Sequence, residues 1–121
     1  MEFLTDADFR HLVNPGVVSE QLVSPDNSAS ERVTITRVTV RSRAVQPRHF
    51  HASSEQIWIA LSGAGRLLLA DGRTHPFAAG NVARFEDREM HGFENTGDAP
   101  FVYLAVTAPP IDFTSAYAGK R

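Results

Sequence analysis

Two histidines and a glutamate lie close together in the stretch RHFHASSEQIW, residues 48–58. His49 and His51 are two residues apart, so both side chains project from the same face of an extended strand. Glu55 follows a small polar connection that lets the chain bend and send its carboxylate back to the same point. Histidine and carboxylate bind divalent first-row metals, and the chain has no cysteine. The stretch by itself is compatible with a metal site, but two solvated imidazoles on an exposed strand are the more common explanation of this pattern.

A third histidine strengthens the metal hypothesis. His91 occurs forty residues after His51, in the string MHGFEN, on a segment expected to form an adjacent or opposing strand. Three histidines and one glutamate make a four-ligand set, which leaves one or two positions free on a metal that prefers five or six ligands. On its strand His91 shares a face with Phe93 and Asn95.

The elements that must position these residues are short strands. Residues 17–24 and 31–42 are rich in β-branched residues, and from Gln46 onward extended segments alternate with turn signals. Asp71-Gly72 is typical of a type I′ hairpin turn, since both central residues need positive φ, and Gly80 marks a corner. Turns every eight to twelve residues predict an all-β sandwich or small barrel.

Two further predictions concern the N-terminal residues and the side-chain directions on the strand that contains Glu55. We expect a short helix near the N-terminus, which Asn14-Pro15-Gly16 would end. If Glu55 faces the interior, its alternation partners do too, which are Ile57, Ile59 and Leu61. Gln56 and Trp58 would then point away from the metal, Gln56 to the surface and Trp58 to the other sheet face or a partner.

Length and charge bound the class of protein. The chain has 121 residues, is 42% hydrophobic and carries a formal charge of −2, which fits one domain with a single core. Interspersed acids and bases exclude a broad basic surface, so we expect no nucleic acid partner. No apolar run approaches a bilayer span and the N-terminus is acidic, so we expect a cytoplasmic protein without a membrane anchor.

The paired motifs resemble those of the cupin superfamily. His-x-His, three residues, Glu55 and a later Gly63 are similar to its first motif, and Gly80 followed by His91 and Asn95 is similar to its second. The resemblance spans roughly residues 33–107. It implies a double-stranded β-helix or jelly-roll barrel, preceded by an N-terminal helix and strand arm over residues 1–32 and followed by a tail over residues 108–121, all in one domain.

The resemblance also implies a site and a set of functions. His49, His51, Glu55 and His91 would hold one divalent transition metal per chain, which would be Fe, Mn, Ni or Zn. The metal would support O₂-dependent oxidation of a small molecule, as in a dioxygenase, or Lewis-acid chemistry of the isomerase or lyase type. The alternative is a small-ligand binding or sensor protein without catalysis. Tyr103 and Phe93 are candidate pocket residues, although a core or interface position is the favoured explanation of Tyr103, and we expect a homodimer.

Overall fold

The computed structural model describes residues 1–113, and this part of the chain consists mainly of antiparallel strands. The strands are β1 (Arg10–Asn14), β2 (Val17–Val23), β3 (Thr34–Val40), β4 (Val45–His49), β5 (Glu55–Ser62), β6 (Ala64–Leu69), β7 (Thr74–Ala78), β8 (Val82–Phe85), β9 (His91–Glu94) and β10 (Phe101–Ala108). Two single 3-10 turns, η1 (Asp6–Asp8) and η2 (Ala70–Gly72), complete the regular structure described.

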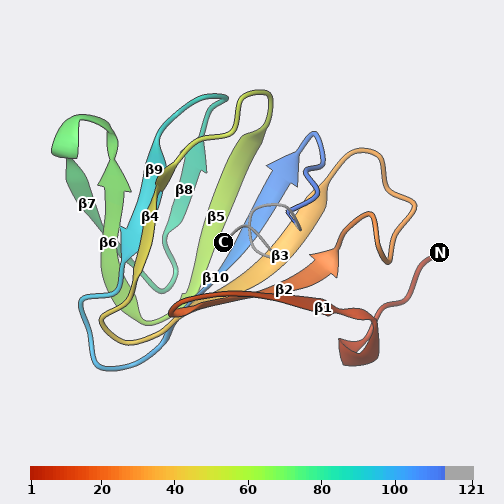
Figure 1. Ribbon diagram of the computed structural model, residues 1–121, viewed down its shortest axis with the longest axis horizontal. Coiled ribbons are helices and arrows are strands. Elements are labelled where there is room, and N and C mark those ends of the chain that lie inside the picture. The colour runs from red at the N-terminus through yellow and green to blue at the C-terminus, as the bar shows by residue number, and fades with distance from the viewer. Residues whose placement is uncertain (114–121) are drawn as a thin grey trace.

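The strands form two sheets that face each other. The larger sheet has the order β1-β2-β3-β10-β5-β8, and the smaller one has the order β4-β9-β6-β7. Figure 1 shows the smaller sheet on the left, with the larger sheet extending from behind it to the lower right. Strands far apart in the sequence pair directly, since β10 lies between β3 and β5. The all-β jelly-roll prediction is therefore confirmed.

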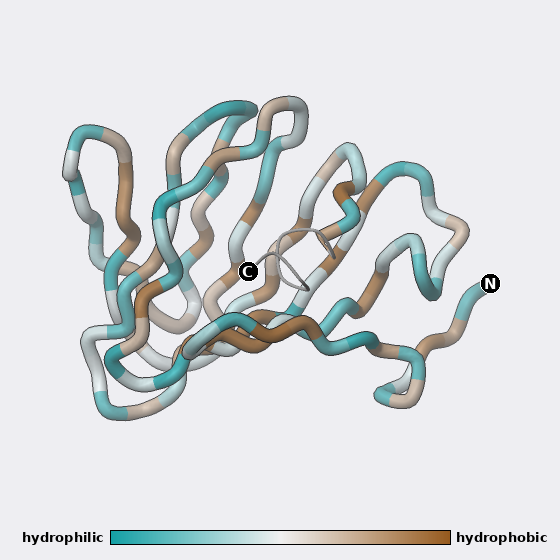
Figure 2. The backbone as a smooth tube through the Cα atoms, viewed as in Figure 1, coloured by the Kyte–Doolittle hydropathy of each residue, from teal (hydrophilic) through white to brown (hydrophobic). Residues whose placement is uncertain are grey.

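The core lies between the inner faces of the two sheets and is mainly aromatic. Trp58 packs against Tyr103 with ring centroids 4.2 Å apart, and Phe93 stacks on Phe101 at 4.0 Å. All four rings are at most 1% exposed. Hydrophobic residues follow the strands, whereas most of the connecting loops are hydrophilic (Figure 2). Large aromatic side chains bury the most apolar area per residue, so they determine which strand faces point inward.

The side-chain phase of β5 differs from the sequence expectation. Gln56, Trp58 and Ala60 face the core, and the residues between them are only partly buried. The expectation that Ile57, Ile59 and Leu61 would line the interior is therefore wrong, as is the outward placement of Trp58. Both faces of β5 are apolar, so alternation does not distinguish them. Inward Trp58 buries a large ring, and outward Glu55 avoids burying a charge.

The predicted N-terminal helix is limited to the single turn η1. Residues 10–14, which the helix was expected to include, form β1, where Leu12 is 4% exposed and lies opposite Ser19 of β2. A hairpin turn containing Gly16, whose φ is +74°, joins the two strands. Pairing with β2 supplies both hydrogen bonds and burial, which a short isolated helix lacks. The N-terminal arm is thus continuous with the larger sheet.

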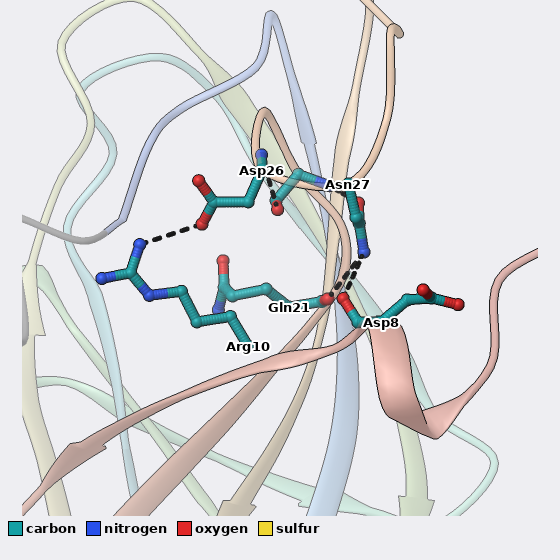
Figure 3. Close-up of polar contacts among 6 residues, drawn as sticks. Asp8, Arg10, Gln21, Asp26 and Asn27 are labelled. Carbon is teal, nitrogen blue, oxygen red and sulfur yellow. Dashed lines mark hydrogen bonds and ion pairs between the residues drawn. The ribbon is translucent and has the colours of Figure 1, made fainter.

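A polar cluster attaches the loop after β2 to the N-terminal segment. Asn27 Nδ2 donates hydrogen bonds to the backbone oxygens of Asp8 and Gln21, at 3.2 and 3.4 Å (Figure 3). Arg10 forms an ion pair with Asp26 at 3.0 Å. One asparagine therefore ties together η1, β2 and the loop.

Other local expectations are met by the structure. Asp71 and Gly72 both have positive φ, at 59° and 72°, as the predicted hairpin turn requires. Gly80 lies at a corner with φ of 91°. Of the tail expected over residues 108–121, the structure describes residues 108–113. Within residues 1–113, no helix has the length and apolar character needed to cross a membrane.

Candidate metal centre

Three histidines from two regions of the sequence lie close together, where β4 ends and β9 begins. His49 ends β4, His51 follows it, and His91 begins β9, where it lies opposite His49 in the strand register. One nitrogen of each ring lies within 4.8 Å of the corresponding nitrogens of the other two. The structure thus brings together the three histidines that the sequence identified as ligands.

Backbone carbonyls determine which ring nitrogens face each other. His49 Nδ1 lies 2.9 Å from the oxygen of Pro47, and His91 Nδ1 lies 2.8 Å from the oxygen of Glu89. A carbonyl only accepts, so these contacts favour the tautomer in which Nδ1 carries the proton and Nε2 presents a lone pair. Metal-binding histidines are held in the same way, by donating their other ring N–H to an acceptor.

The Nε2 atom of His51 is buried and has no hydrogen-bond partner in the described structure. Buried polar atoms are nearly always satisfied, so such an atom needs an explanation. His51 also contacts Phe113 from the tail, with ring centroids 5.8 Å apart. An imidazole nitrogen directed at two other imidazoles, with no partner, is suited to bind a cation.

Gln56 places a side-chain oxygen beside this cluster. Its side chain is buried, and its Oε1 accepts a hydrogen bond from Trp58 Nε1 at 2.8 Å, while its Nε2 donates to Thr107 Oγ1 at 2.9 Å. Because the indole N–H can only donate, this contact fixes which end of the amide is oxygen. The same Oε1 lies 3.1 Å from His91 Nε2.

Both ring nitrogens of His91 therefore face acceptor oxygens, but the neutral ring carries only one proton. Its Nδ1 faces the oxygen of Glu89 and its Nε2 faces the oxygen of Gln56, so either tautomer leaves one pair of acceptors in contact. A second proton or a cation at Nε2 removes the conflict. The ring stacks on Phe85 at 4.3 Å and is 1% exposed, which disfavours the second proton.

The pKa shifts agree that the cluster is neutral. Burial, together with the charge of His49, lowers the pKa of His91 to about 3 and that of His51 to about 4. Burial also lowers the pKa of His49. Near neutral pH all three rings thus keep the lone pairs that metal binding requires.

Glu55 does not lie with the histidines. Its carboxylate forms an ion pair with Arg84 of β8 at 2.7 Å on the outer face of the large sheet, and its side chain is 40% exposed. The expected fourth ligand is therefore not brought to the site, and the expectation that Gln56 points away is wrong. One feature of the sequence could have revealed that Gln56 points inward. Gln56, Trp58 and Ala60 share a face of the strand, and the bulk of Trp58 favours burying that face.

A cavity of about 650 Å³ opens onto His49, His51 and Gln56. Tyr103, a candidate pocket residue, lines it and donates a hydrogen bond to Gln46 at 2.6 Å. Phe93, the other candidate, is fully buried in the core and does not line the cavity as described. The site thus combines a cluster of neutral donors with a space that holds a small molecule.

One curated protein is similar to part of the chain. The chain is 38% identical over 64 residues to a glucose-6-phosphate isomerase of Pyrococcus horikoshii, which covers 48% of the chain and 34% of that relative. The chain therefore spans about a third of the length of this curated relative.

Two solved structures share the fold. One is the polyketide cyclase RemF of Streptomyces resistomycificus, with a TM-score of 0.76, 24% identity and coverage of 89% of this chain and 79% of that one. The other is a sugar phosphate isomerase of the cupin superfamily from Silicibacter pomeroyi, with a TM-score of 0.68, 27% identity and coverage of 78% and 60%.

A family model described as Cupin domain matches residues 36–107. This range covers more than half of the chain and contains all four donors, His49, His51, Gln56 and His91. The match, the two facing antiparallel sheets and the structural relatives agree. The chain belongs to the cupin family.

Proposed function

We propose that this cupin is a metal-dependent enzyme that acts on a small molecule through Lewis-acid chemistry, as an isomerase or lyase. His49, His51, His91 and the Oε1 atom of Gln56 would hold one divalent metal, which when bound polarises a carbonyl or enol oxygen of the substrate. The contact between His91 Nε2 and Gln56 Oε1 carries the proposal, because two acceptors 3.1 Å apart in a buried site are stabilised when both bind one cation.

The charge of the donors favours Lewis-acid chemistry over oxidation. The four donors are three neutral imidazoles and one neutral amide, and Glu55 is engaged with Arg84 outside the site. A carboxylate ligand would offset part of the charge of the ion, whereas neutral donors leave that charge to act on the substrate. Oxidation by O₂ and non-catalytic ligand binding are the competing functions, and the experiments below distinguish them.

The chain's own residues would orient the substrate and the proposed metal-binding amide. Tyr103 and Gln46 form a hydrogen-bonded pair on the cavity wall, where they would position a polar group of the substrate. Trp58 holds the amide of Gln56 in one orientation. The isomerase names of two relatives support the same reaction class.

Metal content tests the site directly. We expect the protein, purified after growth with added metal, to contain about one equivalent of a divalent ion, and H91A or H51A to contain less than about a tenth. H75A removes an exposed histidine of β7 and should retain the metal. Wild-type protein without metal, or equal loading in H91A, would refute the proposed site.

Turnover separates the competing functions. The metal-loaded protein should convert carbonyl substrates such as sugar phosphates or 2-oxo acids without consuming O₂, as an oxygen electrode measures. Oxygen consumption coupled to turnover would instead support the dioxygenase. Tight ligand binding without turnover across a broad panel would support the sensor.

We also propose a homodimer formed by the outer face of the large sheet. Its exposed apolar side chains include Val13, Leu61 and Val82, which are exposed by 62%, 47% and 64%. Glu20 and Arg37 on this face pair with each other, so a partner needs to supply mainly apolar surface. Six strands at about 4.8 Å spacing and about 20 Å long present on the order of 600 Å², near the ~800 Å² per partner of a stable dimer. An identical sheet face meets this requirement.

A further inference from the structure

The cavity beside the candidate metal centre has an unusual balance of charge. Among its described lining residues there is no aspartate or glutamate, and Arg48 is the only arginine or lysine. The four proposed metal donors are neutral as well. With a divalent ion bound, the cavity would therefore hold a positive charge that no nearby carboxylate offsets, and a ligand with a negative charge would be favoured.

Much of the cavity wall is apolar. Val17 of β2 and Val38 of β3 are each 3% exposed, and Val45, Phe50 and Phe113 line the same space. These residues come from both sheets and the tail, so an apolar body would be enclosed from several sides. A sugar-like body would leave hydroxyls without partners against these walls, at a cost of about 1–3 kcal/mol for each buried group.

Several polar side chains of the wall already have hydrogen-bond partners within the protein. Tyr103 donates to Gln46, both on the wall, and Ser19 of the wall accepts from Gln21 at 2.7 Å. A ligand with many hydroxyls would have to break these pairs to be satisfied, whereas a ligand whose oxygens are confined to one end would not.

We propose that the cavity binds a small anion of the 2-oxo carboxylate class with an apolar body. This inference rests on the proposed function, because the two adjacent oxygens of the ligand would occupy the positions that four protein donors leave on the metal. The apolar body would lie against Val17, Val38 and Phe50.

Three ligands separate the effect of the ligand's charge from that of its apolar body. Their binding is measured by calorimetry on zinc-loaded protein whose zinc content has been determined. Benzoylformate is a 2-oxo anion with an apolar body, its methyl ester removes the charge, and 2-oxogluconate keeps the anion but has a hydroxylated body. We expect benzoylformate to bind at least about tenfold more tightly than either control. Equal or tighter binding of the ester or of 2-oxogluconate would overturn the inference and leave the metal site intact. Absence of bound zinc would overturn the proposed function and this inference together.

A matched pair of variants tests the charge argument within the protein. Val45 lies on β4, lines the cavity and is 45% exposed, so polar substitutions there are tolerated by the fold. V45E should weaken benzoylformate binding about five- to tenfold through charge repulsion, while V45Q should change it less than about twofold. Both should keep the zinc content of the wild type. Equal affinities of V45E and V45Q would contradict an anionic ligand.

Discussion

The two faces of β5 place adjacent residues in opposite environments. On the outer face Glu55 pairs with Arg84 and its side chain is 40% exposed. On the inner face Gln56 is 4% exposed and contacts Trp58, Thr107 and His91. The charged residue, which is the stronger metal ligand by type, lies outside the site, and the neutral amide lies within it. Residue type alone therefore does not identify a ligand; the direction of the side chain decides.

The hydrogen bonds around Gln56 explain why the inner position is so well defined. The indole of Trp58 determines the position of the amide oxygen, and Thr107 accepts from the amide nitrogen. Trp58 itself is held between Tyr103 and Phe85, with ring centroids 4.2 and 5.2 Å away. A donor held at both ends in a packed core is preorganised for a metal, whereas the exposed carboxylate of Glu55 is not.

The largest expected difference between the two faces is in metal affinity. We predict that Q56A weakens zinc binding about 100-fold, as loss of a ligand or of its support does, while E55A changes it less than about twofold. Competition with a chromophoric chelator measures both affinities. Because Q56A leaves the indole N–H of Trp58 unpaired at a cost of about 1–3 kcal/mol, unfolding in urea must be measured alongside.

Q56E serves as the control for that comparison. It keeps an oxygen at the donor position, so we expect it to retain zinc although the unfolding free energy changes. Loss of zinc in E55A with retention in Q56A would place the ligand on the outer face and contradict the structure.

A smaller effect is expected for a substitution on the outer face of β5, where the affected quantity is dimer affinity. We predict that L61K raises the dimer dissociation constant about 30-fold, corresponding to about 2 kcal/mol for an apolar side chain removed from an interface. Sedimentation equilibrium measures this constant. V45K, an exposed position on the smaller sheet, is the matched control and should leave association unchanged. A protein that is monomeric at high concentration would refute the proposed dimer.

The smallest effect concerns the stability of the metal-free protein. In the folded state the pKa of His51 is lowered to about 4 and that of His91 to about 3. Between these pKa values and the ordinary value of 6.5, the unfolded chain therefore binds more protons than the folded chain does. Stability is thus fully present above 6.5 and is lost as the pH falls. We predict that the wild type loses about 1 kcal/mol more than H51N between about pH 7 and pH 5, measured by urea unfolding. Equal losses would show that the shift of His51 does not contribute.

The sequence predicted most of the strands correctly, and it identified three histidines that the structure places close together. Alternating β-branched residues identify β3, and positive φ at Asp71-Gly72 agrees with the hairpin turn expected there. His49, His51 and His91 were recognisable because their spacing on paired strands is conspicuous. The N-terminal helix was wrong because β1 gains burial and hydrogen bonds only from its pairing with β2, which local sequence does not reveal.

The sequence by itself determined the type of fold and the imidazole donors, because both depend on local periodicity and on which residue types the chain contains. Only the tertiary structure decided that Gln56 joins those donors and that Glu55 does not. Both faces of β5 are apolar, so a one-residue change of phase leaves its alternation pattern equally acceptable. The choice depends on Trp58 packing in the core and on Arg84 of the neighbouring strand, which are contacts that exist only once the sheets have formed.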